Sequence, residues 1–318
     1  MKVLITGCSG FIGSNLLERC LAEGWDVFGV DNMSNGHRKF MPRVICNVDF
    51  DDFVSRRSLR EIRNNSWDVV FHLAAVPRVS YSVEHPVETN NTNVSKTIDL
   101  LTACRDCVGR VVFASSSSVY GGADVLPTPE TCPKNPQSPY ALQKSIVEEY
   151  LKLYSSLYKL DSACLRFFNV FGKNALGSSP YATALSAWLT AIKSGQPMRS
   201  DGDGTQSRDL CHVDNVVEAC VLAAKHSGSL QASCYNVACG DRTMNNEIMK
   251  YLQSRYPLSV KLDAPWRPGD VMHTQADISK ISSTLGYAPL VRVWEGIEKT
   301  CDWYDANWSW IQHLKQNI

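Results

Sequence analysis

The chain has 318 residues, 44% of them hydrophobic, and its 32 basic residues balance 32 acidic ones. This composition is typical of a globular protein with a sizeable core. A net charge of zero gives no indication of a nucleic-acid partner or an anionic membrane, so small molecules are the expected partners. No segment is apolar enough to span a bilayer and no targeting segment is evident, so we expect a cytoplasmic protein.

The first predicted elements form a strand, a glycine-rich turn and a helix. The strand covers residues 3–5, and the helix covers 14–23. Between them stands a GxxGxxG pattern, whose glycines permit a tight turn and a close approach of the backbone to a pyrophosphate, while the helix N-terminus stabilises the anion. The predicted dinucleotide contacts in this turn are Gly7, Ser9, Gly10, Phe11, Ile12 and Gly13.

A second predicted strand, residues 25–30, ends at Asp31, eighteen residues beyond Gly13. A carboxylate at this place accepts hydrogen bonds from the ribose hydroxyls and repels a 2′-phosphate, which predicts NAD rather than NADP. Asn32 follows as a further candidate contact. The loop over 32–43 also contains His37, Arg38 and Lys39, so NADP stays open at this point.

Strands and helices continue to alternate, which predicts an α/β Rossmann fold with a doubly wound parallel sheet and a smaller substrate-binding domain. We assign 1–172, with returning segments near 205–241, to the NAD-binding domain, and 173–204 and 242–318 to the substrate domain. The site is expected in the cleft between them. The expected elements after residue 31 are a strand over 44–48, a helix over 59–64, a strand over 68–72, a helix over 93–107 and a strand over 110–114.

Several polar and small residues fall where these strands end, at the edge of a parallel sheet that binds ligands. Asp49 and Phe50 are the predicted adenine contacts, with Asn47 and Val48 as alternatives if the register differs. His72 is interpreted as a packed core histidine. The other residues at this edge are Leu73, Ala74 and Ala75 after one strand and Ser115, Ser116, Ser117 and Ser118 after the next.

Tyr140 and Lys144 stand at positions i and i+4 of a predicted helix, so they share one face. A free tyrosine ionises near ~10, and a neighbouring ammonium favours the phenolate. We therefore expect Lys144 to lower the pKa of Tyr140 until it works as a general base. This spacing is common on solvated helices, and only the serine run and the glycine-rich turn give it a catalytic meaning.

The chain has twelve cysteines, which are interpreted as buried free thiols because they lie in apolar patterns. Cys104 and Cys107 form the one CxxC pair, and no second pair follows at a zinc-like spacing. No metal site is therefore predicted. The other cysteines that carry this interpretation are Cys8, Cys20, Cys46, Cys164, Cys211, Cys220 and Cys234.

Taken together and in order, these motifs resemble the extended short-chain dehydrogenase/reductase family in its nucleotide-sugar epimerase branch. The similarity covers nearly the whole length and is greatest to UDP-glucose and UDP-N-acetylglucosamine 4-epimerases. The segments that carry it are 7–13, Asp31, 72–75, 115–121, 140–144, 166–172, 202–214 and 267–270.

The resemblance implies a catalytic role for three residues. Tyr140 takes the proton from the sugar 4-hydroxyl as hydride leaves C4 for NAD, and Ser116 hydrogen-bonds the same oxygen. Lys144 holds the nicotinamide ribose. The 4-keto sugar then rotates and accepts hydride on its other face. Asn93 and Phe167 are further implied contacts of the cofactor.

The resemblance also implies contacts to a UDP-sugar. Asn169, Arg208 and Arg267 bind the diphosphate, because amides and guanidinium groups suit phosphate oxygens. Asp270 accepts from the uridine ribose, and Arg199 lies along the uracil. The implied contacts around the hexose are Val79, Ser116, Ser117, Ser118, Tyr181, Ala182, Thr183, Trp188 and Thr274.

Three serines at 116–118 favour simple 4-epimerisation, since relatives that dehydrate or decarboxylate carry an acid in this segment. Thr274 aligns with a position that is small in enzymes accepting an N-acetyl group, which favours UDP-GlcNAc over UDP-Glc. Pro77 and Arg78 depart from that group, and one such pocket difference discriminates by only ~1–3 kcal/mol. Both sugars, and a uronic acid, therefore stay open.

By analogy with the family, we expect a homodimer formed through the helices over 93–107 and 148–160. Two alternatives to an epimerase are carried forward. One is a non-catalytic dinucleotide-binding sensor of the same fold, which the presence of Ser116, Tyr140 and Lys144 disfavours. The other is a dehydrogenase with net redox output, which would accumulate NADH.

Overall fold

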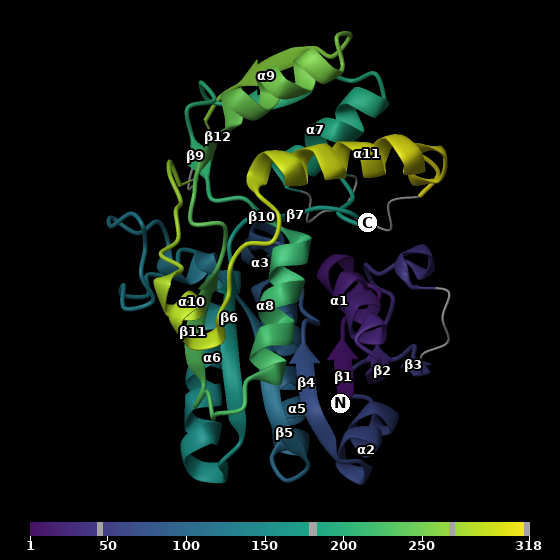
Figure 1. The fold of residues 1–318 in the computed structure, drawn as a ribbon, viewed down its shortest axis with the longest axis vertical. Helices are drawn as coiled ribbons and strands as arrows, with labels where there is room; N and C mark the ends of the chain where they lie inside the picture. Colours follow the sequence, from purple (N-terminus) through teal and green to yellow (C-terminus); the bar gives the residue numbers. More distant parts are fainter. Residues whose placement is uncertain (43–46, 178–182, 267–270, 315–318) are drawn as a thin grey trace.

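A computed structural model describes residues 1–42, 47–177, 183–266 and 271–314. It has two layers, a sheet covered by helices and an upper layer above the carboxyl ends of the strands (Figure 1). The strands of the sheet are β1 (Lys2–Thr6), β2 (Asp26–Val30), β3 (Asn47–Asp49), β4 (Trp67–His72), β5 (Val108–Ser116), β6 (Asp161–Phe167) and β11 (Ser233–Val237). Shorter strands are β7 (Val170–Phe171), β8 (Met198–Asp201), β9 (Ser207–Arg208), β10 (Cys211–His212), β12 (Thr243–Met244) and β13 (Lys261–Ala264).

The α-helices are α1 (Phe11–Ala22), α2 (Arg56–Asn64), α3 (Val79–Glu84), α4 (Pro86–Asn90), α5 (Lys96–Cys104), α6 (Pro139–Tyr158), α7 (Ala184–Lys193), α8 (Val213–Lys225), α9 (Asn245–Arg255), α10 (Ser279–Leu285) and α11 (Val293–Ile311). Short 3-10 turns are η1 (Arg38–Phe40) and η3 (Ser117–Tyr120), and η2 (Asn91–Ser95) is a π turn. The first helix thus begins three residues earlier than predicted, and the helix expected over 93–107 opens as a π turn and ends at Cys104.

The main sheet has the order β11-β6-β5-β4-β1-β2-β3, and all its pairs are parallel. β4, β5 and β6 are almost continuously buried, because helices cover both faces of a parallel sheet. The strand order reverses beside β1, where doubly wound sheets open a crevice for ligands. This confirms the predicted fold class.

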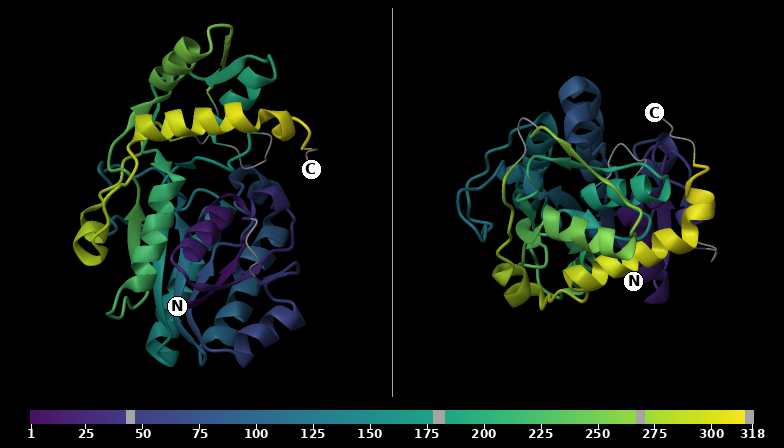
Figure 2. Two further views of the ribbon diagram at one scale, coloured as in Figure 1. Left: turned by 45° about the vertical axis from the view of Figure 1, so that its right-hand side comes forward. Right: turned by 90° about the horizontal axis from the view of Figure 1, so that it is seen from above.

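Two hydrophobic clusters attach the helices to the two faces of this sheet. On one face, Leu16 and Leu17 of α1 pack with Val216 and Cys220 of α8. On the other face, side chains of α2, α5 and α6 such as Leu101 pack against the strands. The carboxyl ends of the parallel strands point toward the upper layer, where α11 crosses above them (Figures 1 and 2).

The upper layer has a core of its own. Leu189 of α7, Leu252 of α9 and Ile297 of α11 belong to one buried cluster. Ile281 and Leu285 of α10, in the segment assigned to the substrate domain, pack in the core of the sheet layer. These side chains stand one helical turn apart, and α10 contacts β11.

The cysteines within the described ranges are free thiols, and most are buried, as predicted; Cys46 lies outside these ranges. The Cys107 thiol donates to the backbone oxygens of Ala103, at 3.2 Å, and Ile62, at 3.3 Å, which is a packing role. Among the described residues, no helix combines the length and apolarity that crossing a membrane requires.

Candidate active site

The glycine-rich turn after β1 leaves room for backbone alone. Gly7 has a φ of +74°, and a Cβ there would lie 2.9 Å from the backbone N of Ala74. A Cβ on Gly13 would lie 1.9 Å from the Gly7 oxygen. The first intrahelical bond of this turn runs from Ser14 N to Gly10 O, so the amides of residues 11–13 have no acceptor within the helix. This is a cradle for an anion such as a pyrophosphate.

Asp31 stands at the carboxyl end of β2, 8% exposed, and holds the turns on either side of it. Its carboxylate accepts from Ser9 N and Met33 N, each at 2.8 Å. Two of the basic residues because of which NADP stayed possible face aromatic rings. The Arg38 guanidinium lies 4.7 Å from the Phe50 ring centroid, and Lys39 lies over Trp310. Asn32 is exposed beside them and accepts from Ser34 N.

The adenine end of the predicted site lies where β3 ends. Asp49 is the last residue of β3, and its backbone oxygen accepts from Asp31 N at 3.0 Å. Its buried carboxylate receives the Ser58 hydroxyl at 3.4 Å, and Phe50 is 45% exposed at the same edge. Asp49 and Phe50 thus stand at the carboxyl end of β3, and the alternatives Asn47 and Val48 lie earlier in the same strand.

The loop after β4 is held from beneath by polar side chains. Asn93 is buried, and its amide accepts from Val76 N at 2.8 Å and donates to Val76 O at 3.0 Å. In this structure Asn93 fixes the loop that carries Leu73, Ala74 and Ala75. His72 hydrogen-bonds Thr6 and Thr97, and burial lowers its pKa to about 3, so it is a neutral core histidine as interpreted.

Tyr140 and Lys144 lie on the face of α6 that packs on β5. Ser138 caps the helix by accepting from Ala141 N at 3.2 Å, which places Tyr140 in the first turn. Tyr140 is 9% exposed and Lys144 is 4% exposed. The Lys144 ammonium donates to Ala114 O at 2.7 Å and lies 5.8 Å from the Tyr140 ring centroid.

The electrostatics of this pair correct one expectation. Burial raises the pKa of Tyr140 to about 12, and an interaction with Ser116 opposes the rise only in part. Burial also lowers the pKa of Lys144 to about 7, against the opposing charge of Glu148. The expected lowering of the Tyr140 pKa by Lys144 is absent here, because the ammonium faces Ala114 O and desolvation penalises both charged forms.

Ser116 ends β5 and begins the next turn. Its Oγ accepts from the Ser118 hydroxyl at 2.9 Å and from Ser118 N at 3.2 Å, so it caps η3. Ser117 and Ser118 are half-buried beside it. Ser117 also lines a small hollow with Thr274. The structure therefore brings Thr274, the predicted gatekeeper, to the turn that follows Ser116.

The predicted diphosphate contacts meet above β6. Asn169, with a φ of +31°, donates to Asp209 O at 3.1 Å and to the Thr274 hydroxyl at 3.2 Å. Arg208 Nη1 donates to Ser207 O and to Met272 O. Asn169, Arg208 and Thr274 are thus held together by the chain segments that carry them. Arg267 and Asp270 lie outside the described residues.

The remaining substrate candidates, which include Arg199 as the predicted uracil contact, are more scattered. Trp188 is buried in the upper layer, and its indole N–H donates to Arg199 O at 2.7 Å, so it serves as a packing residue in place of the predicted hexose contact. Arg199 pairs with Asp201 on the surface. Thr183 caps α7, and Val79 is exposed at the start of α3. Tyr181 and Ala182 lie outside the described residues.

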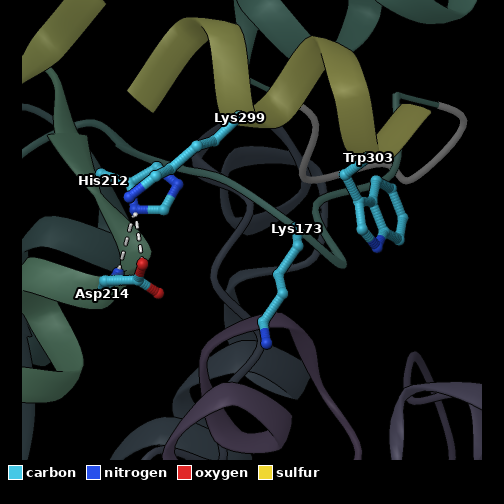
Figure 3. Close-up of a pocket in the computed structure, with 5 residues that line it drawn as sticks. All are labelled: Lys173, His212, Asp214, Lys299 and Trp303. Carbon is cyan, nitrogen blue, oxygen red and sulfur yellow. Dashed lines mark hydrogen bonds and ion pairs between the residues drawn. The ribbon is translucent and has the colours of Figure 1, made fainter. Parts of the chain in front are cut away.

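A separate hollow of about 200 Å³ lies under α11, away from these residues. Figure 3 shows Lys173, His212, Asp214, Lys299 and Trp303 around it. Both lysines are already in ion pairs, Lys173 with Glu18 and Lys299 with Glu295. Burial lowers the pKa of His212, which favours the neutral ring. The hollow contains none of the predicted site residues.

Sequence reasoning missed the buried ionic groups that support the site. Asp209 is fully buried, and its carboxylate accepts from the backbone N–H groups of Cys239, Gly240 and Ala276 at 3.0, 3.1 and 3.0 Å. It joins three chain segments beside Asn169. Burial raises its pKa to about 7, although these donors favour the carboxylate. The local sequence signal for this buried carboxylate was an acidic residue directly after Arg208.

Comparison with known proteins gives a consistent result. Residues 3–238 match the sequence profile of the NAD dependent epimerase/dehydratase family. UDP-glucose 4-epimerase of Mycolicibacterium smegmatis is 34% identical over 314 residues, 96% of this chain and 98% of that protein. UDP-N-acetylglucosamine 4-epimerase from Methanobrevibacter ruminantium, solved with UDP-N-acetylmuramic acid, has a TM-score of 0.90 at 31% identity, over 96% of this chain and 98% of its own. UDP-glucuronic acid 4-epimerase from Bacillus cereus, solved with UDP-glucuronic acid and NAD, has a TM-score of 0.86 at 26% identity, over 99% of this chain and 100% of its own.

The doubly wound sheet, the glycine cradle and the serine, tyrosine and lysine at one edge define a dinucleotide-binding protein of the short-chain dehydrogenase/reductase class. The chain belongs to the NAD dependent epimerase/dehydratase family. Its cofactor is NAD. The residues present fit this group, since the cradle at Gly7 and Gly13 admits no side chain and Asp31 provides a carboxylate at the end of β2, where an acid that binds the ribose hydroxyls is expected.

Proposed function

We propose that the protein is an NAD-dependent UDP-sugar 4-epimerase. The observation that carries this proposal is the position of Ser116, Tyr140 and Lys144, which stand together where β5 meets α6, at the sheet edge that also carries the glycine cradle. The relatives described above act at C4 of UDP-sugars by their names. The upper layer is proposed to hold the nucleotide and the sheet layer the cofactor.

In the proposed mechanism, Ser116 and Tyr140 both bind the sugar 4-oxygen. NAD, when bound in the cradle, supplies the acceptor and donor of the C4 hydride. Tyr140 takes the hydroxyl proton and later returns it, and Lys144 in its charged form favours the phenolate. Because the 4-keto sugar has to rotate between the two half-reactions, the binding affinity is expected to come mainly from the diphosphate, which Asn169 and Arg208 are proposed to bind.

The proposed substrate is UDP-GlcNAc, UDP-Glc or both. Thr274 supports the proposal of a pocket that accepts a 2-acetamido group, because its side chain is small and a hollow lined by Ser117, Gly122 and Ala123 adjoins it. A UDP-uronic acid is the alternative, and the Bacillus cereus protein carries that name. Cofactor contacts by Gly7, Asp31, Asp49 and Phe167 are part of the same proposal.

We also propose a homodimer. Leu142, Leu153, Leu157 and Tyr158 of α6 are all more than 40% exposed, at 49%, 48%, 60% and 43%. Apolar side chains gathered on one exposed helix are typical of an interface. A second copy of the chain that presents the same helix would cover them.

The test is an NMR assay of the purified protein with UDP-GlcNAc, UDP-Glc and UDP-glucuronic acid, without added reductant. Formation of the galacto epimer from UDP-GlcNAc ahead of UDP-Glc would support the acetamide pocket, and conversion of the uronic acid alone would replace the substrate assignment. Tyr140→Phe is the matched control, which should lose turnover and still bind NAD. Accumulation of NADH beyond the enzyme concentration would indicate a dehydrogenase, and no conversion with NAD bound would favour a sensor.

A further inference from the structure

A buried ion pair lies directly beneath the catalytic edge. Glu148 is on α6, one turn after Lys144, and is 0% exposed. Arg166 is on β6 and is 3% exposed. The guanidinium binds the carboxylate in a bidentate manner, with Nε to Oε1 at 2.9 Å and Nη2 to Oε2 at 2.8 Å. Such pairs fix the relative orientation of the two groups as well as their distance.

The pair holds the chain on both sides of Ser116. The Ser115 hydroxyl donates to Glu148 Oε1 at 2.6 Å, which ties down the residue before Ser116. Arg166 Nη1 donates to the Tyr120 phenol at 2.8 Å, and Tyr120 ends the turn that Ser116 caps. Hydrogen bonds from residues on both sides of Ser116 therefore lead to the same ion pair.

Glu148 also contributes a charge to the surroundings of Lys144. The groups that face the Lys144 ammonium are Phe113 and Ala114 O from β5, the neutral His72 from β4, and Tyr140 from its own helix. None of these carries a negative charge. Glu148 favours the ammonium from one turn away, and it faces Arg166 and Lys134 in turn, the latter at 3.2 Å.

We propose that Glu148 and Arg166 are positioning residues of the reaction, which together hold Ser116 against the Tyr140–Lys144 face, and that the Glu148 carboxylate favours the charged form of Lys144. Neither touches the sugar or the cofactor. The proposal rests on the proposed function for its kinetic part. The ion pair would act only through Ser116 and Lys144, so its removal should change turnover and leave substrate affinity nearly unchanged.

The kinetic test uses Ser115→Ala and Tyr120→Phe, each of which removes one link and keeps the ion pair. We expect kcat to fall about tenfold in each, with KM within about twofold, because a misplaced donor weakens transition-state contacts first. In Glu148→Gln, the limb of the kcat profile that reports loss of the Lys144 proton should move to lower pH. Unchanged kcat in both link variants, or an unmoved limb in Glu148→Gln, would overturn the proposal.

A matched control is Asp161→Asn. Asp161 pairs with Arg110 at 2.6 Å and joins the same strands, β5 and β6, at their opposite ends. It should lower stability and leave kcat and the pH profile as in the wild type. If Asp161→Asn lowers kcat as much as Ser115→Ala does, the effect is general loosening of the sheet and the positioning role is refuted.

A thermodynamic cycle decides the Lys144 part even if no UDP-sugar turns over. Glu148→Gln and Lys144→Met are combined in the full-length protein, and the unfolding equilibrium constant is measured at pH 6 and pH 9. We expect coupling of about tenfold at pH 6, where Lys144 is charged, and little at pH 9. Asp161→Asn should not couple to Lys144→Met at either pH. Coupling that is absent at pH 6 refutes this part, whereas inactivity of the wild type refutes only the proposed function.

Discussion

Replacing Lys144 by methionine should stabilise the NAD-free protein while abolishing its activity. The ammonium is 4% exposed and donates to a backbone oxygen rather than a carboxylate. A fall of its pKa from 10.5 to about 7 corresponds to a penalty of about 5 kcal/mol for burying the charge. Losing the bond to Ala114 O costs about 1–2 kcal/mol. The net gain expected at pH 6 is therefore about 3 kcal/mol.

The pH dependence follows from the depressed pKa. Between about 7 and 10.5 the unfolded chain holds a proton on Lys144 that the folded protein does not, so the stability of the wild type rises with pH across this window. The penalty is complete below pH 7. The advantage of Lys144→Met should thus be greatest at pH 6 and fall to near zero by pH 10.

Urea unfolding of both proteins without NAD at pH 6, 8 and 10 measures this difference. Lys134→Met is the control, because the Lys134 ammonium contacts Glu148 and carboxylates raise its pKa. That variant should lose stability at pH 6. If Lys144→Met is less stable than the wild type at pH 6, or if its advantage is the same at pH 10, the argument from the buried charge is refuted.

Three further changes test the glycine cradle, the buried Asp209 carboxylate and the proposed dimer. Gly13→Ala should weaken NAD binding at least a hundredfold by calorimetry, because its Cβ would lie 1.9 Å from Gly7 O. Asp209→Asn should lower the free energy of unfolding by about 1–3 kcal/mol in urea, since an amide nitrogen cannot accept from the backbone donors that the carboxylate satisfies. Leu153→Glu should produce monomers in light scattering, because it places a charge in the proposed helix interface.

Each of these changes has a matched control. Gly24→Ala has no atom near its added Cβ and should leave NAD affinity unchanged. Asp214→Asn changes a half-exposed carboxylate and should cost little stability. Leu258→Glu, at a residue that is 97% exposed in the upper layer, should leave the dimer intact. A control that behaves like its partner variant would contradict the local explanation.

The fold could be predicted because its signals are local. β4 and β5 each contain a short apolar run, at residues 69–71 and 111–114, as expected of strands buried on both faces. The spacing of Tyr140 and Lys144 determines their shared helix face in any fold. The strands predicted over 25–30, 68–72 and 110–114 lie within two residues of β2, β4 and β5, whereas residues 44–46 of the strand predicted over 44–48 lie outside the described residues. The π turn η2 contains Asn93, whose side chain bonds Val76, 17 residues away.

The supporting groups could not be predicted, because their partners are distant in the sequence. Glu148 meets Ser115 across 33 residues, and Asp209 meets Ala276 across 67. Trp188 was predicted as a sugar contact because the segment 181–188 resembles the corresponding segment of family members that accept an N-acetyl group. Its indole N–H instead satisfies the backbone oxygen of Arg199, which only the three-dimensional packing of β8 against α7 reveals.

The same burial that positions Tyr140 and Lys144 also opposes their ionisation. Near neutral pH the ligand-free protein holds a protonated Tyr140, with a pKa of about 12, beside a lysine of pKa about 7. Near pH 7 Tyr140 is therefore neutral and Lys144 is only partly charged before ligands bind. A general base at Tyr140 requires positive charge beside the phenol, so either Lys144 turns from Ala114 O toward Tyr140 or a bound cation lies next to it. Glu148 keeps the first route open, because it is the anion that favours a charged Lys144.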